Sequence, residues 1–175
     1  MKNKLSIKSL WVVIISTLLQ GVLPIANSAI DENEYPEAPE IEEVLAAKSP
    51  PAGVLFNVLE YEEDALEWIV PRIEHYVTLL RQHYPQLEIA IVSHGDEIFA
   101  LRDEEKWLYK DVHKRIQRLS EQLDVTFHVC GAYAKANGVD ESEFPQYVDV
   151  VPLATTQIKD YREFGYTVIT TELSW

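Results

Sequence analysis

The chain has 175 residues, of which 29 are acidic and 15 are lysine or arginine, so its formal net charge at pH 7 is −14. A surface this acidic repels the phosphates of nucleic acids and of anionic lipids, which argues against a nucleic acid partner. The length suffices for one domain with a sizeable core, and the single cysteine excludes an internal disulfide.

Residues 1–29 have the organisation of a secretory signal peptide. Lys2, Lys4 and Lys8 make the start basic, residues 10–23 are mostly apolar, and small residues end the region. The apolar segment is short for a membrane span. We therefore expect cleavage on export, a periplasmic mature protein and no stable membrane insertion afterwards. An uncleaved anchor is the alternative.

Residues 30–52 are rich in glutamate and proline and contain few large apolar side chains. This composition is typical of a flexible acidic arm, within which residues 42–47 could form one or two helical turns. The folded domain is expected over residues 53–175.

Within that domain, short apolar segments alternate with segments of helical periodicity. Helices are expected around residues 66–80, 108–123, 132–136 and 155–161, and Pro71 should make the first of them start near Val70 or bend. The alternation predicts a single α/β domain, a doubly wound, mostly parallel five-stranded sheet with helices on both faces. The five strands are predicted at residues 54–59, 87–93, 125–130, 148–151 and 166–170.

The only cysteine, Cys130, stands where the third strand should end and a short helix should begin. Val125, Phe127 and Val129 alternate with more polar residues, and Gly131 ends the strand pattern. Unpaired backbone N–H groups and the positive end of a helix dipole favour an anion at such a junction, so the thiol could ionise readily and act as a nucleophile. The alternative is a small buried residue that closes the strand.

Five short segments follow one another in a characteristic order and spacing, one of them around this cysteine. They are residues 93–95, 129–131, 137–139, 147–151 and 164–169. Together they resemble the DsrE/DsrF-like family of sulfur-relay proteins, over about residues 53–170. The resemblance implies an α/β fold, a homo-oligomer such as a trimer or hexamer, and sulfur carried as a persulfide on the cysteine at this strand end. The expected export and the acidity depart from the relay members, which puts their cytoplasmic partners in doubt.

Two histidines are candidates for assisting Cys130 in catalysis. His128 lies two residues earlier and so on the same face of its strand, and His94 follows the end of another strand. Either could promote the thiolate. Each could equally have a structural role, His94 in capping a turn and His128 in packing inside the sheet.

Gly95, Gly131 and Tyr133 lie next to these residues in the sequence and are the candidate lining of a ligand pocket at the strand ends. A soft metal site that combines Cys130, both histidines and Asp96 would lack the usual ligand spacings, so we expect neither a metal nor a cofactor. The sequence also lacks the motifs of serine hydrolases, P-loop proteins and dinucleotide-binding enzymes.

Two functions follow from these observations. The first is a periplasmic sulfur-relay-like protein that carries sulfane sulfur on Cys130, acting as a sulfur carrier or sulfurtransferase with donor and acceptor proteins as partners. The second is a non-catalytic, oligomeric module that uses the same fold to bind a small ligand or another protein. The accessibility and reactivity of Cys130 distinguish the two.

Overall fold

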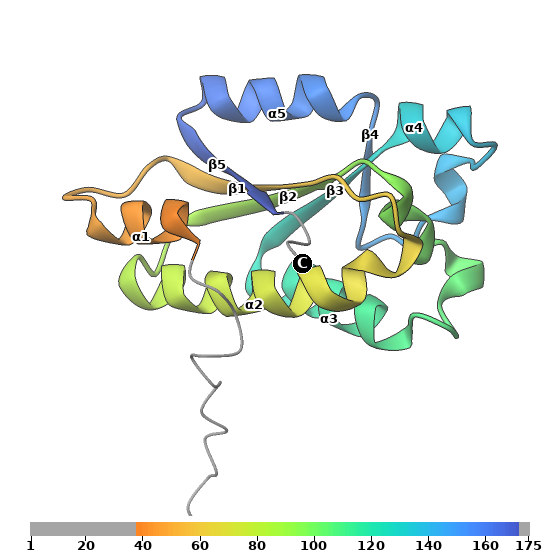
Figure 1. The fold of residues 1–175 in the computed structure, drawn as a ribbon, viewed down its shortest axis with the longest axis horizontal. Coiled ribbons are helices and arrows are strands. Elements are labelled where there is room, and N and C mark those ends of the chain that lie inside the picture. Colours follow the sequence, from red (N-terminus) through yellow and green to blue (C-terminus); the bar gives the residue numbers. More distant parts are fainter. Residues whose placement is uncertain (1–37, 172–175) are drawn as a thin grey trace, which may run out of the picture. The chain divides into compact units, whose positions relative to one another are not determined.

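The structure, a computed structural model, describes residues 38–171 (Figure 1). All strand pairings in this part of the chain are parallel, and the strand order is β4-β3-β2-β1-β5. The predicted α/β fold is confirmed, and every strand lies within one residue of its predicted bounds. The strands are β1 (Gly53–Val58), β2 (Glu88–Ser93), β3 (Val125–Cys130), β4 (Asp149–Val151) and β5 (Tyr166–Thr171).

Helices cover both faces of the sheet, with α2 and α3 on one face and α5 on the other (Figure 1). The α-helices are α1 (Pro39–Ala46), α2 (Leu66–His83), α3 (Lys110–Leu123), α4 (Gly131–Ala136) and α5 (Ala154–Glu163). Short 3-10 helices occur in the connections, namely η1 (Glu63–Ala65), η2 (Asp96–Leu101), η3 (Asp103–Glu105) and η4 (Glu141–Glu143).

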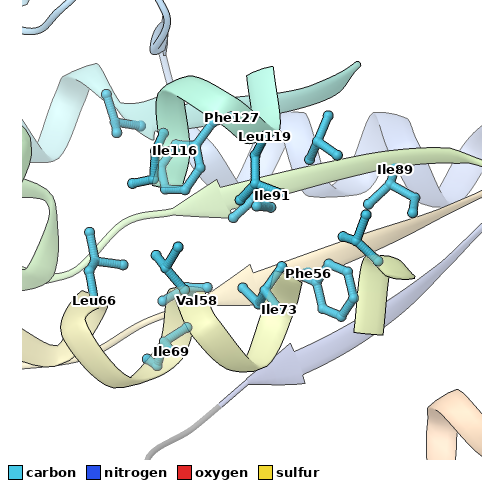
Figure 2. Close-up of a cluster of buried hydrophobic side chains, with 14 of the residues drawn as sticks. Phe56, Val58, Leu66, Ile69, Ile73, Ile89, Ile91, Ile116, Leu119 and Phe127 are labelled. Carbon is cyan, nitrogen blue, oxygen red and sulfur yellow. The ribbon is translucent and has the colours of Figure 1, made fainter. Parts of the chain in front are cut away.

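The hydrophobic core has two layers because each strand sends alternate side chains to opposite faces. The larger layer lies between the sheet and helices α2 and α3, and Figure 2 shows part of it. It includes Phe56, Ile91 and Phe127 from the strands, Ile69 and Ile73 from α2, and Ile116 and Leu119 from α3. The smaller layer lies beneath α5 and includes Leu55, Ala90, Val92, Cys130, Ala154 and Ile158. Burial on both faces explains the continuous apolar runs of the strands.

Helix α2 starts at Leu66, before the start near Val70 that Pro71 had suggested. Pro71 lies in the second turn, where its missing N–H removes a single intrahelical hydrogen bond. Leu66 and Ile69 in the first turn are fully buried. Burial of these two side chains outweighs the loss of one hydrogen bond, so the helix continues through the proline.

The expected signal peptide, residues 1–29, lies outside the described residues, as does the first part of the expected arm. Within residues 30–52 the structure differs from a flexible arm, because Pro39–Ala46 forms helix α1. Ile41 and Val44 are one turn apart and buried, and the Tyr84 hydroxyl group donates to the carbonyl oxygen of Ala47 over 2.9 Å. The helical turns considered for residues 42–47 are thus present as part of a longer helix that begins at Pro39. In the part of the chain that the structure describes, no helix has the length and apolar character to cross a membrane.

Candidate functional site

Cys130 is the last residue of β3 and immediately precedes α4, so the predicted junction of strand and helix is present. Its thiol takes part in no disulfide, and the residue is only 4% exposed. The side chain belongs to the smaller core layer, together with Val92 of β2 and Ala154 of α5. The thiol therefore lies at the carboxyl edge of the sheet but is covered by apolar side chains.

His128 lies on the same face of β3, where both of its ring nitrogens have partners. Nδ1 is 2.8 Å from Oδ2 of Asp149 on β4, and Nε2 is 2.8 Å from the hydroxyl oxygen of Tyr161 on α5. Burial lowers the pKa of His128, and the nearby charge of Asp149 opposes this effect only in part. The ring is therefore neutral at neutral pH, donates from Nδ1 to Asp149 and accepts at Nε2 from Tyr161. Neither nitrogen is directed at the thiol.

His94 lies at the same edge of the sheet as Cys130. Ser93 pairs with Val129 in the β2–β3 register, so His94 and Cys130 are the next residues at the same edge of neighbouring strands. Nε2 of His94 is 2.8 Å from Oδ1 of Asn57, and burial lowers the pKa of His94. A neutral ring that donates from Nε2 to this amide oxygen keeps Nδ1 as the nitrogen that can accept a proton. Asn57 lies on β1, across β2 from the strand of Cys130, so this hydrogen bond holds the Nε2 end of the ring on the side away from the cysteine.

Gly131 lines a cavity of about 580 Å³ between α4, β4 and the segment that follows α4. Lys135 provides a cation there, Asp140 and Glu141 provide carboxylates, and Val151 provides an apolar wall. Cys130, Gly95 and Tyr133 are outside the lining of this cavity. Of the three expected pocket residues, this cavity includes Gly131, immediately next to the cysteine in sequence.

Tyr133 connects α4 to η2 across the carboxyl ends of the strands. Its hydroxyl group donates to Oδ1 of Asp96 over 2.5 Å, and its ring stacks on Phe99 with centroids 6.0 Å apart. The hydrogen bond to Asp96 raises the pKa of Tyr133 to about 12. Since the ring also packs against the core layer that contains Cys130, Tyr133 helps to cover the region of the thiol.

Gly95 allows the backbone after β2 to approach the backbone after β1 closely. A Cβ atom at this position would lie 2.1 Å from the carbonyl oxygen of Glu60. The N–H of Gly95 donates over 2.9 Å to Oε1 of Glu97, a fully buried carboxylate. Gly95 therefore holds together the connections that follow β1 and β2.

Glu97 was not a candidate in the sequence, although it organises this edge. Oε1 also accepts from the hydroxyl group of Ser93 over 2.7 Å and from the N–H of His94 over 2.9 Å, and Oε2 accepts from the N–H of Glu60 over 2.9 Å. Burial raises the pKa of Glu97, whereas these hydrogen bonds oppose the shift. The one available signal was an acidic residue at the start of an apolar segment, residues 98–101.

Within residues 38–171, no group of three or more His, Cys, Asp or Glu side chains is arranged to hold a metal ion. Asp96, the fourth member of the metal site considered from the sequence, binds the Tyr133 hydroxyl group instead.

Comparison with known proteins identifies the family. The model of the DsrE/DsrF-like family matches residues 22–171, whereas no curated protein matches the chain. A solved protein of unknown function, MTH1491 from Methanobacterium thermoautotrophicum, is 20% identical with a TM-score of 0.55, and the alignment covers 67% of this chain and 97% of that one. A conserved protein of unknown function, BT1422 from Bacteroides thetaiotaomicron, is 14% identical with a TM-score of 0.48, over 67% of this chain and 94% of that one. The first likeness supports the fold, and the family match covers most of the sequence, so the chain belongs to the DsrE/DsrF-like family.

Proposed function

We propose that this protein is a sulfur carrier in which Cys130 holds sulfane sulfur as a persulfide. Membership of the DsrE/DsrF-like family suggests a sulfur-relay-type function at the level of the family. The observation that carries the specific proposal is the position of the only cysteine, an unpaired thiol at the carboxyl end of β3. In parallel α/β sheets this edge is where ligands and reactive groups gather.

The proposed transfer is a thiol exchange. The thiolate of Cys130 attacks the outer sulfur of a donor persulfide, R–S–SH, so that a bond forms from Sγ to this sulfur and the donor S–S bond breaks. The donor leaves as the thiolate RS⁻ and takes up the proton that Cys130 lost. Delivery reverses the roles, because an acceptor thiolate attacks the outer sulfur and Cys130 leaves as a thiolate.

His94 is the proposed base for this exchange. It follows Ser93 at the same edge of the neighbouring strand, and its hydrogen bond to Asn57 leaves Nδ1 as the basic nitrogen. His128 has a different proposed role, because Asp149 and Tyr161 occupy both of its nitrogens. It supports β3 and α5 around the cysteine.

The burial of Cys130 adds a requirement for access. At 4% exposure the thiol cannot meet a donor protein in this conformation. We infer that local opening at α4, where Tyr133 covers this edge, precedes transfer.

The setting of the reaction is also part of the proposal. The basic and apolar sequence of residues 1–29 supports export to the periplasm. The family resemblance supports a homotrimer or homohexamer. Large exposed apolar side chains on the described part of the chain, namely Tyr61, Trp68, Trp107 and Phe164, offer surfaces for such contacts.

A second candidate function is a non-catalytic module that binds a small ligand. It is favoured by the apolar burial of Cys130 and by the cavity of about 580 Å³ next to Gly131. In this case the thiol only fills space beneath α5.

Incubation with polysulfide separates the two functions. A carrier gains the mass of one or more sulfur atoms on the intact protein, and cyanide or a reductant removes them. Cys130→Ser should abolish the gain while the fold is kept, because oxygen is a close steric substitute but a poor nucleophile. If the native protein takes up no sulfur and resists alkylation, the carrier proposal is wrong and the binding module stands.

A further inference from the structure

We propose a second ligand site at the amino-terminal edge of the sheet, which binds a small organic cation such as a protonated amine or a quaternary ammonium group. The proposal is independent of sulfur transfer. It rests on a cavity, a fixed pair of tyrosine rings and the balance of charge around them.

The cavity has a volume of about 470 Å³ and lies on the face of the sheet that α5 covers. Glu88, the first residue of β2, and Asp124, which directly precedes β3, place it at the amino edge. Thr126 in its lining and Cys130 are four residues apart on β3, which corresponds to roughly 13 Å along the strand. The volume falls within the range of small-molecule sites, roughly 300–1,000 Å³.

Two aromatic rings form one corner of the cavity. The ring centroids of Tyr161 and Tyr166 are 4.7 Å apart, and the ring planes are inclined by 57°. Both residues line the cavity, and the negatively polarised face of an aromatic ring attracts a cation within about 6 Å of its centroid.

Both rings are held in place by their hydroxyl groups. Tyr161 donates to Nε2 of His128, and Tyr166 donates to the carboxylate of Glu88. The Tyr166 ring crosses above Gly53 of β1, where a Cβ atom would lie 2.2 Å from a ring carbon. Gly53 therefore makes room for the ring to reach from β5 to β2. A corner fixed in this way loses little freedom when a ligand binds.

The charge of the lining favours a cation over an anion. Glu88 and Asp124 contribute carboxylates, and Arg81 is the one lysine or arginine in the lining. The two terminal nitrogens of Arg81 donate to the carbonyl oxygens of Leu123 and Asp124, so the guanidinium is engaged by the backbone. Two carboxylates against one guanidinium give the lining a net negative charge, which repels an anion and attracts a cation.

The tyrosines experience the same negative field. Burial raises the pKa of Tyr161 and outweighs the lowering effect of a hydrogen bond with Gln157, and the carboxylates of Asp149 and Glu88 add to the rise. Burial and the hydrogen bond to Glu88 likewise raise the pKa of Tyr166. Both phenols are therefore neutral at physiological pH, as a cation–π contact with an uncharged ring requires.

The test compares choline with 3,3-dimethylbutan-1-ol, a neutral molecule of nearly the same shape, in titrations of the full ¹⁵N-labelled chain followed by NMR. We expect choline to shift the amide signals of Ala90, Thr126 and Tyr166 in a saturable way. The neutral alcohol should bind about tenfold more weakly or worse, because it lacks the charge. Equal binding of the two probes, or no saturable shift with choline, would overturn the proposal.

Variants at Glu88 and Tyr161 test whether these residues contact choline. Glu88→Gln keeps an acceptor for Tyr166 but removes the charge, and should weaken choline binding several-fold. Tyr161→Leu should weaken it by roughly two- to thirtyfold, whereas Tyr161→Phe, which keeps the ring but loses its hydrogen bond to His128, should weaken it less than Tyr161→Leu does. Glu163→Gln removes one exposed carboxylate from α5 outside the cavity and is the matched control for charge. Unchanged affinity in Glu88→Gln, or an equal loss in Glu163→Gln, would show that no specific site exists. Cys130→Ser should leave choline binding unaltered.

Discussion

The hydroxyl group of Tyr161 on α5 donates a hydrogen bond of 2.8 Å to Nε2 of His128 on β3. The other nitrogen of this ring is 2.8 Å from Asp149 on β4. One buried imidazole thus connects two strands to the helix that covers them. Its two nitrogens match one acceptor and one donor only when the ring is neutral. Protonation would add an N–H at Nε2, and the Tyr161 hydroxyl group that faces it could then no longer donate to His128.

This arrangement predicts that acid destabilises the fold. Burial lowers the folded-state pKa of His128, and it does the same for His94 and His113. The unfolded chain, with histidine pKa values of about 6.5, then binds more protons than the folded chain, so stability is full above about pH 6.5 and is lost as the pH falls through the folded pKa values. Urea denaturation at pH values from about 7.5 to 5 should show a falling free energy of unfolding.

A variant at His128 tests how much of that pH dependence comes from this residue. His128→Gln cannot be protonated and should flatten the curve, although it lowers stability at pH 7 because one of its hydrogen bonds is lost. The same change at the exposed His83 is the control and should leave the slope unaltered. A slope that is identical in His128→Gln and in the native protein would contradict this assignment.

The sequence predicted the strands well because strands that are buried on both faces consist of continuous apolar residues, as β1 and β2 do. It also placed Cys130 at a strand end, since Gly131 interrupts the alternation locally. It could not supply the partners of His128, because Asp149 and Tyr161 are 21 and 33 residues away and only the tertiary fold joins them. The role of Glu97 could not be predicted for the same reason, since it accepts from the N–H of Glu60, which lies in the segment after β1.

The two histidines near Cys130 should differ in their effect on its reactivity. His94 keeps a basic nitrogen at the edge where Cys130 lies, so His94→Ala should slow alkylation by iodoacetamide by roughly tenfold. His128→Gln, which alters a structural link, should change stability more than the alkylation rate of the folded fraction. Rates are compared at equal folded fraction, measured by circular dichroism. A larger slowing in His128→Gln than in His94→Ala would reverse the proposed roles.

Access to Cys130 should depend on Tyr133. Its ring packs against the core layer that contains the cysteine and is tied to Asp96, so native Cys130 should react much more slowly than the same residue in denaturant. Tyr133→Ala removes this cover and should accelerate both alkylation and sulfur uptake several-fold. Leu108→Ala truncates an exposed apolar residue just before α3 and is the control. If both variants react at the native rate, access follows another route.

The contact between the segment that follows β1 and the segment that follows β2 should be the most sensitive part of the carboxyl edge. Gly95→Ala would bring a Cβ atom to within 2.1 Å of the Glu60 carbonyl oxygen, so the backbone must shift, at a cost of about 1–3 kcal/mol or more.

Glu97→Gln keeps the shape of the side chain but replaces one acceptor oxygen by an NH₂ group. This group would face the N–H of Glu60 or the donors of Ser93, His94 and Gly95, at a cost of about 1–3 kcal/mol. Glu104→Gln, at an exposed position, is the matched control and should stay within about 0.5 kcal/mol of the native protein in urea denaturation. Because Glu97 positions the backbone of His94, Glu97→Gln should also slow alkylation of Cys130 in the fraction that is folded. A variant with native stability and native alkylation rate would show that the buried carboxylate does not organise this edge.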